Sequence, residues 1–144
     1  MTEDAAGLDY HNVEHSHILV VEDEPATLAL LERMLVSAGY RMTGAPDGIA
    51  ALDAARADPP DLVLLDLIIP GVDGYGVCAL LKRDSNFHAP IVVLSGRTSE
   101  MDVKAAFDAG ADALVPKPLD RKPLLAKVAE LLAARPLTGP EPTR

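Results

Sequence analysis

The sequence is poor in aromatic residues and cysteine, and it has no excess of basic residues. Only 3% of its 144 residues are aromatic, so Leu, Val, Ile and Ala must fill the core. Cys78 is the single cysteine, which excludes an internal disulfide and suits a reducing cytosol. With 13 basic and 22 acidic residues, the formal net charge is −9. An acidic chain repels phosphate backbones, so we expect no direct nucleic-acid binding by this domain.

Long hydrophobic runs are also missing. The first ten residues, MTEDAAGLDY, are acidic and contain no apolar segment, which argues against a signal peptide. No apolar run approaches the roughly 20 residues that span a bilayer. We therefore expect a cytoplasmic protein without membrane association. The length predicts one domain, divided into a flexible leader over 1–16, a folded domain over 17–135, and a Pro/Gly-rich tail or linker over 136–144.

Strand-like and helix-like segments alternate five times along the folded part. Apolar runs at 18–21, 61–66 and 90–95 predict central strands, a more polar segment at 40–45 predicts an edge strand, and 112–117 predicts a short strand. Helices are expected at 25–39, 48–57, 75–84, 99–110 and 121–135. This alternation predicts an α/β fold: a flavodoxin-like, doubly wound (βα)5 three-layer sandwich with a parallel five-stranded sheet of order 2-1-3-4-5.

Polar residues occur where the predicted strands end. Glu22 and Asp23 end the first strand, Asp66 ends the third, Ser95 ends the fourth, and Lys117 ends the fifth. Singly, the first two could merely favour a helix N-terminus, and the serine and lysine could be ordinary turn and surface residues. Ligands of such sheets bind beyond the carboxyl ends of the strands, between strands one and three. We therefore expect these side chains to form one cluster.

The residue types in this cluster favour one kind of chemistry. Carboxylates held close together repel each other unless a cation neutralises them. All-oxygen ligands suit Mg²⁺, or Mn²⁺ in its place, whereas the lack of His and Cys disfavours zinc. An acid beside such a metal, a hydroxyl group and a lysine can accept or transfer a phosphoryl group.

Four segments, ILVVEDEP, LVLLDLIIPGVDG, VVLSG and VPKP, resemble the signature blocks of CheY-like response-regulator receiver domains from two-component signalling. The resemblance covers about residues 17 to 135. It implies that Asp66 accepts a phosphoryl group from the phosphohistidine of a sensor histidine kinase or histidine phosphotransfer protein. It also implies that Asp23 binds Mg²⁺ directly, that Glu22 reaches the metal through water, and that the backbone carbonyl of Ile68 is a further ligand beside Asp66.

The same resemblance assigns the remaining positions. Ser95 would hydrogen-bond the phosphoryl group as the switch hydroxyl, Lys117 would pair with a phosphate oxygen, and the Lys117–Pro118 peptide bond would be cis. The fourth helix, fifth strand and fifth helix would carry the signal to a protein effector or fused output domain, and a homodimer is possible. Leu114 stands where many receivers have Tyr or Phe, so this output face is expected to respond differently. Such a protein catalyses only its own phosphotransfer and dephosphorylation.

Other functions remain as alternatives. A phosphatase of the haloacid dehalogenase type needs a second acid two residues after its nucleophile, but Ile68 stands there, and no cap domain fits in the chain. A flavin carrier needs a phosphate-cradling first loop, whereas EDEPAT is acidic. An unphosphorylated receiver-like scaffold would be expected to lose part of the site, which is complete here. Because Ile68 offers no polar group to orient water, we also expect a long-lived Asp66 phosphate.

Overall fold

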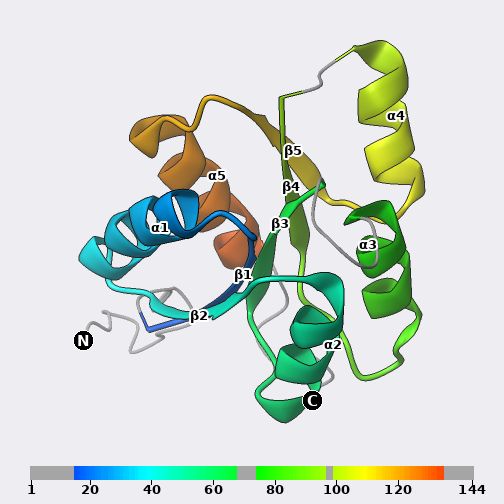
Figure 1. The fold of residues 1–144 in the computed structure, drawn as a ribbon, viewed down its shortest axis with the longest axis horizontal. Helices are drawn as coiled ribbons and strands as arrows, with labels where there is room; N and C mark the ends of the chain where they lie inside the picture. Colours follow the sequence, from blue (N-terminus) through cyan, green and yellow to red (C-terminus); the bar gives the residue numbers. More distant parts are fainter. Residues whose placement is uncertain (1–14, 68–73, 97–98, 135–144) are drawn as a thin grey trace.

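The computed structural model describes residues 15–67, 74–96 and 99–134. These residues form a five-stranded parallel sheet of order β2-β1-β3-β4-β5 that alternates with five helices (Figure 1). The strands are β1 (His17–Val21), β2 (Arg41–Ala45), β3 (Leu62–Asp66), β4 (Ile91–Ser95) and β5 (Ala113–Pro116). The helices are α1 (Pro25–Ser37), α2 (Gly48–Ala57), α3 (Gly74–Arg83), α4 (Glu100–Asp108) and α5 (Arg121–Ala134). The predicted flavodoxin-like fold and strand order are confirmed.

The most apolar strands occupy the middle of the sheet. Every residue of β1, β3 and β4 is buried, whereas β2 has exposed residues and lies at an edge. A strand buried on both faces needs apolar residues at every position, which is the pattern of a parallel sheet covered by helices. The prediction of a polar edge strand is therefore confirmed at β2.

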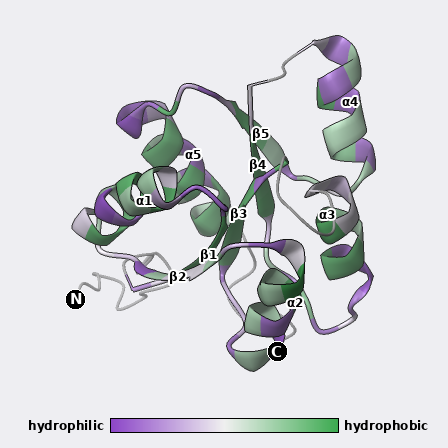
Figure 2. Cartoon of the chain, viewed as in Figure 1, coloured by the Kyte–Doolittle hydropathy of each residue, from purple (hydrophilic) through white to green (hydrophobic). Residues whose placement is uncertain are grey.

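Helices cover both faces of the sheet. One core cluster joins strand residues to α1 and α5, and the other joins them to α2, α3 and α4. Neighbouring strand residues enter opposite clusters, as Leu64 and Leu65 do, because successive side chains point to opposite faces. Figure 2 shows the hydrophobic residues concentrated in the strands. None of the helices in the described ranges is both long and apolar enough to cross a bilayer.

Local sequence signals set where the helices begin and end. Pro25 is at the start of α1, Asp47 caps α2 by accepting a hydrogen bond from Ala50 N at 2.8 Å, and Ser99 caps α4. Gly39 and Gly110 follow α1 and α4 with φ values of 99° and 115°. These left-handed conformations favour glycine and end the helices close to the predicted residues.

Candidate functional site

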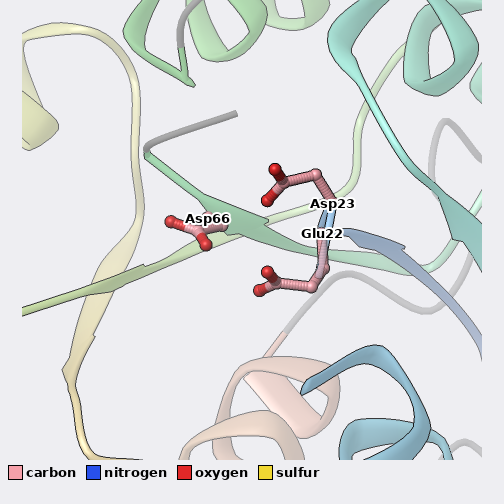
Figure 3. A group of neighbouring side chains, drawn as sticks. All are labelled: Glu22, Asp23 and Asp66. Atoms are coloured by element: carbon pink, nitrogen blue, oxygen red, sulfur yellow. The ribbon is translucent and has the colours of Figure 1, made fainter. Parts of the chain in front are cut away.

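Three acidic side chains meet at the carboxyl edge of the sheet. Glu22 and Asp23 directly follow β1, and Asp66 is the last residue of β3. β1 and β3 are parallel neighbours in which Val21 pairs with Leu65. The residues that follow this pair, Glu22 and Asp66, therefore lie at the same level along the two strands. One carboxylate oxygen from each acid lies within 4.8 Å of the other two, and Figure 3 shows Glu22 and Asp23 pointing towards the side where Asp66 lies.

Glu22 is held by both its backbone and its side chain. Its N–H donates to the carbonyl of Ala45 on β2 at 3.0 Å, and its Oε2 accepts from the N–H of Glu24 at 3.2 Å. The residue is only 3% exposed, and its Oε1 is buried without a hydrogen-bond partner among the described residues. One oxygen therefore fixes the carboxylate, while the other remains available to a ligand.

Burial is also the main cause of the raised pKa of Glu22. Loss of solvent and the nearby negative charge of Asp66 raise this pKa from 4.5 to about 7, against the opposing effects of the Glu24 N–H and of Lys117. The shift means that the folded protein resists ionising this carboxyl group beside a second acid. A bound cation would relieve that cost.

Lys117 brings a positive charge to Asp66 from across the sheet. Its Nζ lies 3.0 Å from Asp66 Oδ2, and only 8% of the Asp66 side chain is exposed. β5 ends at Pro116, one residue before the predicted strand end at Lys117, and the Lys117 N–H donates to the carbonyl of Ser95 at 2.9 Å. The following peptide bond, Lys117–Pro118, is cis as expected.

Ser95 completes this edge of the sheet from the strand between β3 and β5. It is the last residue of β4 and is 5% exposed. Asp66 pairs with Leu94 in the sheet register, so Ser95 lies one position further along the neighbouring strand. The structure thus brings five of the predicted site residues to one edge, whereas Ile68 lies outside the described residues.

The donor set fits a hard divalent cation. The candidate ligand atoms are all carboxylate oxygens, and Asp23 is exposed to solvent. In addition, the buried Oε1 of Glu22 has no hydrogen-bond partner among the described residues. Mg²⁺ favours a few carboxylates together with water molecules, and a partly open acid cluster can provide both. Within the described ranges this is the only group of three or more potential metal-ligating side chains, and it contains no His or Cys.

Sequence reasoning missed the close packing of Gly74 against the backbone of Leu67. Gly74 N donates to the carbonyl of Leu67 at 3.0 Å, and a Cβ added to Gly74 would lie 2.4 Å from Leu67 Cα. Only glycine permits this approach, which fixes the start of α3 against the residue after Asp66. The GVDG sequence signals a turn, but it does not reveal which backbone the glycine touches.

Cys78 takes no part in the site. It is a buried core residue of α3, and burial raises the pKa of its thiol to about 11. A buried, protonated thiol is inert.

Comparison with known proteins identifies the family. Residues 18–129 match the model of the response regulator receiver domain, and the chain belongs to this family. It is thus a receiver domain of two-component systems and not an enzyme in the usual sense.

A curated relative is similar to this chain in sequence. The chain is 37% identical over 119 residues to the transcriptional regulatory protein CseB of Streptomyces avermitilis, covering 83% of this chain and 50% of that protein. The chain therefore spans about half the length of this curated relative.

Two solved receiver domains have the same fold. One is the receiver domain of a sensor histidine kinase from Pseudomonas aeruginosa PAO1, which has magnesium coordinated in its active site cleft. It is 31% identical to this chain with a TM-score of 0.77, and the match covers 83% of this chain and 98% of that one. The other is the BeF3-activated N-terminal receiver domain of RstA from Klebsiella pneumoniae. It is 31% identical to this chain with a TM-score of 0.76, and the match covers 81% of this chain and 97% of that one.

Proposed function

We propose that Asp66 is the phosphoacceptor of this receiver domain. The observation that carries the proposal is its position between two acids on one side and the Lys117 ammonium at 3.0 Å on the other. A carboxylate held by a lysine and placed next to a potential metal site can approach a phosphorus atom without facing uncompensated negative charge.

The metal in this proposal is Mg²⁺ or Mn²⁺. Asp23 and Asp66 would bind it directly, Glu22 would act through water, and the carbonyl of Ile68 would be the further protein ligand. The close carboxylate oxygens support this assignment, and so does the buried Glu22 Oε1, which has no hydrogen-bond partner in the described ranges. The magnesium in the receiver domain from Pseudomonas aeruginosa supports it as well.

Phosphoryl transfer would then follow an in-line path. An Asp66 oxygen attacks the phosphorus of a phosphohistidine, a P–O bond forms, and the P–N bond breaks with its electron pair left on the imidazole nitrogen. The metal would neutralise charge on the phosphoryl oxygens. Lys117 would pair with one of those oxygens, and the Ser95 hydroxyl would hydrogen-bond another. These groups act by position and charge rather than by proton transfer.

The partners follow from this role. The phosphoryl donor would be a sensor histidine kinase or a histidine phosphotransfer protein. The phosphorylated domain would pass the signal to a protein effector or to a fused output domain. The face formed by α4, β5 and α5 would carry the signal. The domain could also form a homodimer. On this face Leu114 is half-buried and packs against the cluster of α2, α3 and α4. The cytoplasmic location and the division at residues 16 and 135 stay predictions.

One incubation separates this function from its alternatives. The protein is mixed with acetyl phosphate, with Mg²⁺ or with a chelator, and the products are followed by intact mass and phosphate release. A metal-dependent adduct that is stable in acid and labile in base supports the receiver. In a parallel incubation with a phosphomonoester, sustained hydrolysis would support the phosphatase instead, and a protein that forms no adduct would be a scaffold.

A further inference from the structure

A cavity lies at the edge of the sheet opposite the carboxylate site. Its volume is about 510 Å³, within the usual range of small-molecule pockets. The C-terminal parts of α2 and α3 form its sides, and residues 59–61 and 84–89 close it. None of the five acid, hydroxyl or lysine side chains of the phosphoryl site lines it.

Apolar side chains form much of the cavity wall. Ala55 and Leu81 are buried, Leu52 and Phe87 are partly buried against the same core cluster, and Leu80 is 40% exposed. Leu80 and the aromatic ring of Phe87 both line the cavity and offer apolar surface that a ligand would remove from water. The ligand that fits this wall therefore has an apolar group of its own.

Charged groups of both signs line the same cavity. Arg56 is exposed and forms no hydrogen bond or ion pair with any residue in the described ranges. Asp84 accepts the N–H of Asn86 at 2.9 Å, and Asp61 accepts the N–H of His17 at 2.7 Å. The wall thus offers one guanidinium that has no partner among the described residues, and two carboxylates that accept hydrogen bonds from backbone N–H groups.

We propose that this cavity binds a small zwitterion with an apolar side chain, of the class of aromatic or branched α-amino acids. The apolar side chain would lie on Leu52 and Phe87, Arg56 would hold the carboxylate, and Asp84 would hold the ammonium group. A simple anion would meet two carboxylates on a chain of net charge −9, and a simple cation would leave Arg56 unmatched. A zwitterion satisfies both signs.

The site can be tested without reference to phosphorylation. The ¹⁵N-labelled protein is titrated with L-phenylalanine, with 3-phenylpropionate, which lacks the ammonium group, and with phenethylamine, which lacks the carboxylate. We expect saturable shifts of amides in 52–61 and 80–89, with those of 25–37 and 121–134 unmoved. L-phenylalanine should bind more tightly than either of its half-analogues.

Two substitutions sharpen the result. Arg56→Gln should weaken phenylalanine binding about fivefold and leave phenethylamine unchanged. Asp84→Asn keeps an oxygen for the Asn86 N–H, and it should weaken phenylalanine but not 3-phenylpropionate. Arg33→Gln on α1 is the matched control and should change nothing.

The proposal is overturned if phenylalanine leaves the cavity amides unmoved, if the shifts do not saturate, or if either half-analogue binds as tightly in the wild-type protein. Unchanged phenylalanine binding in Arg56→Gln would also overturn it. The comparison of analogues needs no variant, so it stands even if a substituted protein fails to fold.

Discussion

The ammonium nitrogen of Lys117 lies 3.0 Å from Asp66 Oδ2, although 51 positions separate the two residues in the chain. β4 lies between the strands that lead to them, so the lysine side chain reaches across the end of β4. The contact links the ends of β3 and β5 across β4, at the edge of the sheet where the acids meet. It places the site's cation on the carboxylate that we propose as the phosphoacceptor.

Substituting this lysine should separate metal binding from phosphoryl transfer. In Lys117→Met the negative charge on the transferring group loses its partner, so phosphorylation by acetyl phosphate should slow by roughly 10²-fold. Mg²⁺ affinity, measured by calorimetry, should not fall, because the three carboxylates remain. Lys122→Met, an exposed lysine on α5, is the matched control. An undiminished phosphorylation rate in Lys117→Met would contradict the role of this contact.

The raised pKa of Glu22 predicts how stability depends on pH in metal-free protein. Because this pKa is about 7 in the folded state and 4.5 ordinarily, the folded state binds the proton more tightly. The contribution is complete below about pH 4.5 and is lost as the pH rises through about 7. Urea unfolding should show this decline, and both Glu22→Gln and saturating Mg²⁺ should flatten it.

Glu32→Gln, an exposed acid on α1, should leave the pH dependence unchanged. If the decline persists in Glu22→Gln, another group causes it.

Gly74 should not tolerate a side chain. In Gly74→Ala the new Cβ would lie 2.4 Å from Leu67 Cα, a backbone atom that cannot move without displacing the residue after Asp66. We expect a loss of about 1–3 kcal/mol in the free energy of unfolding, measured in urea. Gly96→Ala is the matched control, because a Cβ there meets no atom within 4 Å. Equal stability of the two variants would disprove the close-packing argument.

The lifetime of the phosphate is predicted from the sequence alone, because Ile68 lies outside the described residues. An isoleucine cannot orient the hydrolytic water, whereas an asparagine at this position can. Ile68→Asn should therefore lose phosphate faster than the wild type after the donor is removed. Ile49→Asn, at an exposed isoleucine of α2, is the control. An unchanged or slower rate in Ile68→Asn would refute the idea.

Much of this architecture follows from the sequence. The apolar runs that become β1, β3 and β4 specify buried central strands, and the strand order then brings Glu22, Asp23 and Asp66 together. Helix ends were predictable where Pro25 and Gly110 mark them. Element limits still differ by one or two residues, as at β5, because backbone hydrogen bonds rather than residue types set them.

Other features depend on contacts that sequence patterns do not encode. The hydrogen bond from the Glu24 N–H to Glu22 Oε2 depends on the path of the chain into α1, and Oε1 has no partner within the part of the chain that the structure describes. The contact of Gly74 with Leu67 and the cavity beside Arg56 depend on how separate elements pack. Periodicity predicts which face of a helix is buried, but not the spaces left between the elements.

The most direct test of the account is to map the phosphoryl group after reaction with acetyl phosphate and Mg²⁺. Borohydride reduction of the acyl phosphate, followed by peptide mass spectrometry, identifies the modified residue. The account predicts modification at Asp66, with none in Asp66→Asn, and strong reduction both in Asp23→Asn and when Mg²⁺ is chelated. Asp53→Asn, a remote acid on α2, should react like the wild type. Modification at another residue, or equal modification of Asp66 without a divalent metal, would contradict it.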